Sequence, residues 1–412
     1  MDKAQRLSIL DDLIKLETVN GNEEKVANYL KDLLEKHGIE TELNKYDDNR
    51  FNLIANIKKG DGPILGLTGH ADVVSTVNDD EWNYGPFNPK HIDGKIFGRG
   101  SSDMKGGLAG MAIAMIELNE DSDFTGNLRF LVTVGEEIGE LGAAKLAKEG
   151  YVDDVKALVV GEPSNSTSRL AMEQLVHAGL IELNGQKPET RMAAFCAHKG
   201  SVTYKVISRG RAAHSSMPEM GINALDNLVS YFNKQKEYFT DLVKLEDDVL
   251  GSTKPSVTVM NGGNQENTIP DYAELTAKVR TIPEYTNDKV ISDIQDLIDK
   301  LNQADPRMKL ELKILSSNLP VKTELDSDFI KLVKASYKDV LGVNIAAVGA
   351  PGGTDASQFV QSNPDLDVVV AGPGNESAHQ VNEFVFEDDY LKYIDIYKTM
   401  ARRFFCLDFN DR

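Results

Sequence analysis

Residues 64–74 read ILGLTGHADVV, a short apolar run that ends at glycine and is followed at once by His70 and Asp72. Three similar runs precede other acidic or histidine-bearing segments: LRFLVTV at 128–134 before Glu136, ALVV at 157–160 before Glu162, and DVVVA at 367–371 before the loop of His379. Such short, β-rich runs predict buried parallel strands. Ligands collect at the carboxyl ends of strands in an open α/β sheet, so we expect the side chains that follow these runs to converge.

The composition narrows the classes of protein that the chain can represent. Its 412 residues exceed what one hydrophobic core normally organises, and 41% of them are hydrophobic, which favours two packed domains. The net charge of -20 argues against binding nucleic acid or an anionic membrane, because both would repel such a surface. The N-terminus has no apolar stretch long enough for a signal peptide, and no apolar segment approaches the length of a transmembrane span. We therefore expect a cytoplasmic protein.

The pattern of predicted elements changes near residue 200. Before it, helices and strands alternate, as in an α/β domain. Helices are expected over 3–16, 23–37, 106–118 and 140–150, and strands over 52–57, 64–69 and 157–160. Residues 200–315 instead predict the order β-α-β-β-α-β, the signature of a ferredoxin-like α+β module. From about residue 316 the α/β pattern returns. We therefore predict a discontinuous catalytic domain over 1–199 and 316–412, with an inserted domain over 200–315.

The acidic and histidine residues form an inventory suited to two hard metal ions. Two metals about 3.5 to 4 Å apart need one bridging ligand and further ligands on either side. Asp103 lies in a turn that opens a glycine-rich helix, where its carboxylate can face both ions. Glu136 and Glu137 are adjacent at a strand end, so their side chains diverge and can take different tasks. Asp72 is placed to accept the second N–H of the His70 imidazole and fix its tautomer.

Each of these pieces is weak evidence by itself. A lone His-x-Asp is more often structural, and paired acids after a strand usually begin a solvated helix. Their fixed order beside predicted strands predicts a two-metal hydrolase. A catalytically silent protein that binds small acidic metabolites in the same cleft is the alternative from another class. The glutamate pair favours the enzyme, because a pure binder needs no general base beside the metal.

The chain resembles the zinc-dependent aminoacylase and carboxypeptidase superfamily that includes succinyl-diaminopimelate desuccinylase and acetylornithine deacetylase. The resemblance covers nearly the whole chain and rests on GHADVV, the W-x-x-x-PF element from Trp82, GRGSSDMKGG, GEEIGE, GEPS, GRAAHSS, NTIPD and AHQVNE. It implies a mixed-sheet α/β catalytic domain with an inserted ferredoxin-like α+β lid and dimerisation domain. It also implies two Zn²⁺ per subunit, with Co²⁺ or Mn²⁺ as substitutes, and a homodimer formed through the lid.

The resemblance assigns roles to the candidate metal site. One zinc would be bound by His70, Asp103 and Glu162, and the other by Asp103, Glu137 and His379. Glu136 would take a proton from the attacking water and deliver it to the leaving amine, while Asp72 orients His70. In this family a glutamate at the position of Glu162 is typical of deacylases and carboxypeptidases, and an aspartate of aminopeptidases.

Further residues are implied at the substrate. His214 resembles the lid histidine that reaches the partner subunit's active site and polarises the scissile carbonyl oxygen. Asn267 and Arg280 match lid positions that contact the substrate's far carboxylate, and Gly353 and Thr354 match a substrate loop. A core or surface role competes with these assignments.

The expected reaction is hydrolysis of a small N-acyl amino acid, with N-succinyl-L,L-diaminopimelate as the first candidate substrate. Acetylornithine deacetylase and a metallo-dipeptidase or carboxypeptidase are the alternatives within the class. Residues 170–199 depart from the simplest family pattern, and we expect an extra hairpin or helix near the cleft there.

Overall fold

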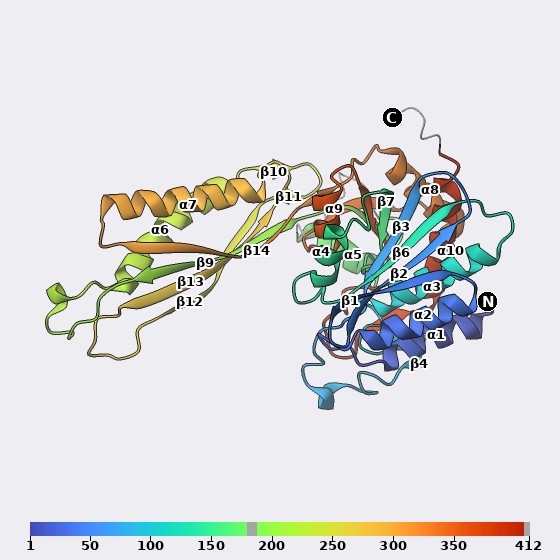
Figure 1. Ribbon diagram of the computed structural model, residues 1–412, viewed down its shortest axis with the longest axis horizontal. Helices are drawn as coiled ribbons and strands as arrows, with labels where there is room; N and C mark the ends of the chain where they lie inside the picture. The colour runs from blue at the N-terminus through green and yellow to red at the C-terminus, as the bar shows by residue number, and fades with distance from the viewer. Residues whose placement is uncertain (179–187, 408–412) are drawn as a thin grey trace. The chain divides into compact units, whose positions relative to one another are not determined.

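A computed structural model describes residues 1–178 and 188–407 (Figure 1). The chain divides into two compact units. Unit 1 comprises Met1–His198, Val321–Ala350 and Thr354–Arg412, and unit 2 comprises Lys199–Pro320 and Pro351–Gly353.

A mixed sheet forms the centre of unit 1, in the strand order β1-β2-β6-β3-β7-β17-β8-β15, with β16 also paired to β8. The strands are β1 (Glu40–Asp47), β2 (Arg50–Lys58), β3 (Ile64–His70), β6 (Asn127–Thr133), β7 (Val155–Val160), β8 (Ala193–His198), β15 (Val321–Lys322), β16 (Ala346–Ala350) and β17 (Asp367–Val370). The pairs β3–β6, β3–β7 and β7–β17 are parallel, whereas β1–β2 and β2–β6 are antiparallel. The predicted parallel strands and mixed α/β sheet are therefore confirmed.

Helices cover both faces of this sheet (Figure 1). They are α1 (Lys3–Lys15), α2 (Glu24–Lys36), α3 (Lys105–Glu120), α4 (Leu141–Lys148), α5 (Arg169–His177), α8 (Asp328–Leu341), α9 (Ala356–Ser362) and α10 (Glu387–Phe404). Helices α3 and α10 pack together on one side, and α4 packs with α9 on the other. A small three-stranded sheet joins β4 (Lys90–Ile92), β5 (Lys95–Phe97) and β18 (Phe384–Phe386).

Glycine lets α3 approach the sheet closely. A Cβ built on Gly107 would lie 2.1 Å from the carbonyl oxygen of Gly161, which directly follows β7. No side chain fits at that distance, so the helix rests against the backbone of the strand end. Helix α3 therefore touches, at Gly107, the segment that carries Glu162.

Unit 2 is a four-stranded antiparallel sheet in the order β12-β13-β9-β14. Its main elements follow in the order β9 (Gly200–Arg209), α6 (Ala224–Leu242), β12 (Lys254–Gly262), β13 (Tyr272–Thr281), α7 (Asn287–Ala304) and β14 (Lys309–Asn318). The short strands β10 (Glu246–Asp247) and β11 (Gly251–Ser252) pair with each other. Residues from both helices and from strands of the sheet share one core. This is the predicted β-α-β-β-α-β order.

Strand β1 was not predicted from the sequence. It lies at the sheet edge, and its charged residues at positions 40, 42, 45 and 47 leave it without an apolar run. The segment 170–199, where an extra hairpin or helix was expected, contains most of helix α5 and the strand β8, and residues 179–187 lie outside the described part. Among the described residues, no helix has both the length and the apolarity that crossing a membrane would require.

Candidate metal centre

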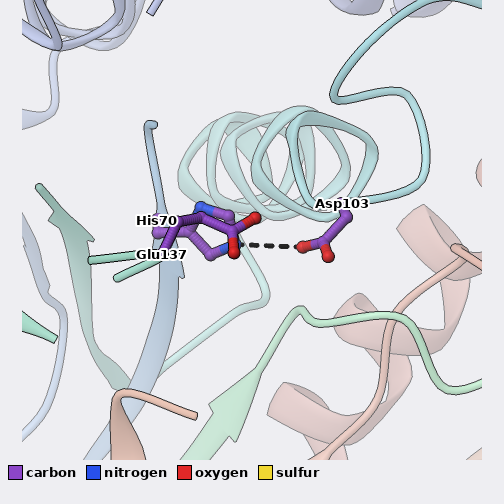
Figure 2. A group of neighbouring side chains, drawn as sticks. All are labelled: His70, Asp103 and Glu137. Carbon is purple, nitrogen blue, oxygen red and sulfur yellow. Dashed lines mark hydrogen bonds and ion pairs between the residues drawn. The ribbon is translucent and has the colours of Figure 1, made fainter. Parts of the chain in front are cut away.

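The topology of unit 1 brings the predicted ligands to one end of its sheet. His70 is the last residue of β3, and Glu136 and Glu137 lie just after β6. Glu162 follows β7 closely, and Asp103 lies in the turn before α3. Figure 2 shows the side chains of His70, Asp103 and Glu137 gathered at this place. The convergence follows from the parallel order of the strands.

The two carboxylate oxygens of Asp103 face different histidines. Oδ1 lies 3.0 Å from His70 Nε2, and Oδ2 lies 3.2 Å from His379 Nε2. His70 Nε2 is also 3.4 Å from Glu162 Oε1, and His379 Nε2 is 3.0 Å from Glu137 Oε1. The contacts therefore divide into two sets that share Asp103, in the same groups that the family resemblance implies.

The separations of these atoms suit metal ligands. Zinc binds nitrogen and oxygen at about 2.0 to 2.2 Å in tetrahedral geometry, which places neighbouring ligand atoms roughly 3.3 Å apart. The contacts of 3.0 to 3.4 Å are close to that spacing. Imidazole nitrogen and carboxylate oxygen are also the donors that zinc takes in hydrolases. The residues present fit a two-metal centre.

The charge of the site points the same way. Burial and the negative charge of Asp103 raise the pKa of Glu162 to about 8. Burial and the negative charge of Glu162 raise the pKa of Glu136 well above its ordinary value, although His70 opposes them. The cluster thus buries more negative charge than the protein's own cations compensate, and divalent cations would balance it.

The histidines are held as cations when only protein surrounds them. Burial lowers the pKa of His70, but Glu162, Asp103 and Asp72 outweigh it and raise that pKa well above its usual range. Hydrogen bonds to Asp103 and Glu137 raise the pKa of His379 to about 10. A metal ion needs neutral imidazole, so ion binding must release these protons.

Glu136 lies beside the ligands. One of its carboxylate oxygens lies within 4.8 Å of a ring nitrogen of His70 and of a carboxylate oxygen of Glu162. Ligand atoms of His70, Asp103 and Glu137 likewise all lie within 4.8 Å of one another. By distance alone Glu136 qualifies as a ligand. The direct ion pairs of the histidines, however, involve Glu137 and Glu162 and not Glu136.

Asp72 differs from its prediction in one detail. The nearest acceptor to His70 Nδ1 is the backbone carbonyl of Asp72 at 2.9 Å, while the carboxylate Oδ1 is 3.7 Å away. The Asp72 carboxylate instead accepts the backbone N–H groups of Glu136 and Glu137, both at 3.2 Å. Asp72 therefore holds the glutamate pair with its side chain and the histidine with its main chain.

The sequence matches the model of peptidase family M20/M25/M40 over residues 66–403. The chain belongs to this family. As a member of the M20 family it is a metal-dependent amidohydrolase.

A curated relative supports the same family, and solved structures of lower identity share the fold. A Staphylococcus aureus protein described as "Probable succinyl-diaminopimelate desuccinylase" is 38% identical, over 96% of this chain and 97% of its own. An M20 metallo-carboxypeptidase from Sulfolobus solfataricus has the same fold, with a TM-score of 0.79 at 21% identity over 99% of this chain and 100% of its own. A dinuclear metal-binding M20 peptidase from Bacillus subtilis gives 0.69 at 18% identity over 98% of each chain.

The predicted substrate residues of this M20 chain fall in both units. Thr354 belongs to unit 1, where its hydroxyl lies 3.2 Å from His198 Nε2 in the buried interior. Gly353 belongs to unit 2. Arg280 lies in β13 opposite Lys254 of β12.

His214 and Asn267 come together within unit 2. His214 forms a backbone bridge with Thr268, and Ser215 donates its N–H to the Asn267 carbonyl at 2.9 Å. The His214 imidazole is exposed and contacts the Ser216 hydroxyl through Nδ1 at 2.8 Å. Two loops thus present the histidine and the asparagine on one surface of this unit.

Two buried acids of the M20 site had no assigned role from the sequence. The Asp355 carboxylate accepts a hydrogen bond from the Thr133 hydroxyl at the end of β6, and burial raises its pKa to about 7. Glu383 accepts the backbone N–H of Asp103. Both acids lie inside segments quoted from the sequence, Asp355 in PGGTDA at 351–356 and Glu383 in AHQVNE at 378–383, and this position is the signal that could have marked them.

Proposed function

We propose that the chain hydrolyses N-succinyl-L,L-diaminopimelate to succinate and L,L-diaminopimelate. The observation that carries the chemistry is the aspartate whose two oxygens each face one histidine-carboxylate pair. The substrate is supported by the description of the Staphylococcus aureus relative, which is 38% identical. A glutamate at position 162 is consistent with a deacylase.

The proposed ligands are His70, Asp103 and Glu162 for one Zn²⁺, and Asp103, Glu137 and His379 for the other. Bound zinc would supply Lewis acidity, which polarises an acyl carbonyl and lowers the pKa of water. The ligands hold their geometry through their backbones at the sheet end. His70 is almost fully buried, at 1% exposure, so its ring has little freedom to turn away.

Glu136 is the proposed general base. Its half-buried carboxylate has an oxygen within 4.8 Å of a ring nitrogen of His70 and of a carboxylate oxygen of Glu162, where it can take a proton from water at the site and return it to the leaving amine. Because Asp72 holds the backbone N–H of both Glu136 and Glu137, the base and the ligand keep a fixed spacing. Loss of the Asp72 carboxylate would therefore disturb both the base Glu136 and the ligand Glu137.

We also propose that unit 2 is a lid and dimerisation domain, with His214 as an oxyanion donor to the partner's site. Strand β12 supports the dimer, because it lies at an edge of the sheet and exposes Val259 and Met260. Light scattering on the protein should give twice the 45.3 kDa of one chain. A particle of one chain's mass at working concentration would refute the dimer.

Substrate profiling tests the proposed reaction. The zinc-loaded protein is assayed for amide cleavage on N-succinyl-L,L-diaminopimelate, acetylornithine and a panel of dipeptides. We expect the highest kcat/KM on the succinyl substrate. A higher kcat/KM on acetylornithine or a dipeptide would leave the amidohydrolase activity in place and would show that the proposed substrate is wrong. If metal analysis after zinc loading finds no bound ion, the silent binding protein becomes the better hypothesis.

A further inference from the structure

Glu383 is a fully buried glutamate four residues after His379. Its Oε1 accepts the backbone N–H groups of Ser102, at 2.8 Å, and of Asp103, at 2.9 Å. Its Oε2 accepts a hydrogen bond of 2.5 Å from Arg99 Nη1. One carboxylate therefore binds three donors that all belong to the turn 99–103.

Other bonds join the same two segments. Asn375 donates its N–H to the Ser102 hydroxyl at 2.7 Å, and that hydroxyl donates to the Asn375 carbonyl at 3.0 Å. The backbone N–H of Gly98 donates to the Glu383 carbonyl at 3.0 Å. Segments 98–103 and 375–383, far apart in the sequence, are thus bound together at both ends.

These segments carry the bridging aspartate and a histidine ligand. Asp103 Oδ2 and His379 Nε2 are 3.2 Å apart, yet the side chain of His379 is 54% exposed. His379 also has a left-handed backbone, with φ of 64°. Because little packing holds this ring, its distance from Asp103 depends on how the two backbones are fixed to each other.

We propose that Glu383 is a positioning residue for the metal centre, which fixes the backbone of Asp103 against the loop of His379. This inference rests on the proposed two-metal function. A carboxylate suits the task because it accepts several hydrogen bonds and balances the charge of buried Arg99. Without it the N–H groups of Ser102 and Asp103 would lose their acceptor in the interior.

Paired substitutions separate the backbone bonds from the ion pair. In Glu383→Gln alone the charge of Arg99 would be left without its partner, which confounds the result. In R99M/E383Q both charges are gone but an amide oxygen remains to accept the two N–H groups. In R99M/E383M the acceptor is gone as well. We expect metal affinity near that of the native protein for the first variant and about 10- to 100-fold weaker for the second.

Metal affinity is measured by titrating the full-length apoprotein with Co²⁺ and recording its visible absorption, with a chelator as competitor. Circular dichroism checks that each variant is folded. Asp389→Asn is the matched control, because Asp389 is also buried and is paired with Arg191 by bonds of 2.7 and 3.1 Å. It should lower thermal stability and leave Co²⁺ affinity unchanged.

The outcomes distinguish the two proposals. If the native protein binds no Co²⁺, the metal centre itself is refuted. If the native protein binds and R99M/E383M binds equally well, or both double variants weaken equally while folded, the positioning role is overturned. Should R99M/E383M fail to fold, Glu383→Asp replaces it, because the shorter side chain keeps the charge but cannot reach all three donors. Unchanged Co²⁺ affinity in that variant would overturn the inference.

Discussion

At the residue scale, the site depends on carboxylates with three different tasks. Asp103 faces both histidines, Glu136, the proposed proton acceptor, has a raised pKa, and Asp72 accepts backbone N–H groups. The difference lies in what each oxygen contacts. A carboxylate surrounded by other negative charges holds a proton more tightly, whereas one that accepts N–H bonds is fixed in place.

Glu136→Gln tests the proton acceptor. The amide is nearly isosteric but cannot take a proton, so we expect turnover to fall by about 100- to 10,000-fold with both metals retained. Steady-state kinetics and metal analysis on the same preparation check this. Glu149→Gln, at an exposed ion pair in the turn after α4, should leave both unchanged. Near-native turnover of the metal-loaded Glu136 variant would exclude the proposed base.

The sequence could predict the residues of the site better than their contacts. His70, Glu136 and Glu162 were predicted as site residues because each follows a β-rich run, and the structure brings atoms of their side chains within 4.8 Å of one another. The hydrogen bonds that the carboxylates of Glu383 and Asp72 accept from main-chain N–H groups were not predicted. These N–H groups belong to distant turns, and no periodicity in the sequence marks a hydrogen bond to main chain.

At the element scale, close packing of α3 supports the site. Gly107 rests against the Gly161 carbonyl, next to the proposed ligand Glu162. Long periodic helices and apolar strands were predicted to within a few residues. The edge strand β1 was not predicted, because its own sequence has no strand-like pattern. It is a strand because it pairs with β2.

Gly107→Ala tests this packing. In a helix interior the exchange of glycine for alanine normally stabilises by about 0.5 to 1 kcal/mol. Here we expect the opposite sign, a loss of about 1 to 3 kcal/mol, because the new Cβ would overlap the Gly161 carbonyl. Gly62→Ala is the control, since no atom lies within 4 Å of its Cβ position. Urea unfolding measures both, and a stabilised Gly107 variant would disprove the contact.

Glu117 joins three helices, since its carboxylate in α3 contacts Arg6 of α1 at 2.7 Å and Lys398 of α10 at 2.6 Å. Burial opposes ionisation of Glu117, but the hydrogen bonds from Lys398 and Arg6 lower its pKa. A lowered folded-state pKa means that the stabilisation is complete above the unfolded pKa and is lost as the pH falls through the folded one.

Glu117→Gln should therefore cost about 1.5 to 3 kcal/mol at neutral pH and progressively less in acid below the ordinary glutamate range. Unfolding free energies of both proteins, measured from pH 7 downward, test the trend. A difference that stays constant with pH would show that packing and not charge accounts for the loss.

At the scale of the whole molecule, metal binding and folding are linked. The five candidate ligands come from five separate segments of unit 1, so the complete set exists only in the folded chain. An ion that binds the folded state at 100 times its Kd stabilises it by about 2.7 kcal/mol. The predicted two-part organisation came from the change in element order near residue 200, whereas the spatial relation of the parts has no sequence signal.

Chelation tests the linkage. Removing bound metal from the native protein with a chelator should lower the Tm and abolish amide cleavage, and added Zn²⁺ should restore both. Asp103→Ala lacks the proposed bridge, so its Tm should not respond to chelator. A native protein whose Tm is indifferent to chelation would contradict a metal centre built from these residues.

The place where unit 2 joins unit 1 has a consequence for protein engineering and for evolution. His198 at the end of β8 pairs directly with Val321 at the start of β15, so the chain departs and returns at adjacent positions of one antiparallel pair. A two-residue turn could close the same pair as a simple hairpin. Residues 199–320, which make up unit 2 apart from Pro351–Gly353, are therefore inserted at one point of the sheet, where a hydrolase could gain, lose or exchange an inserted domain without rearranging its strands.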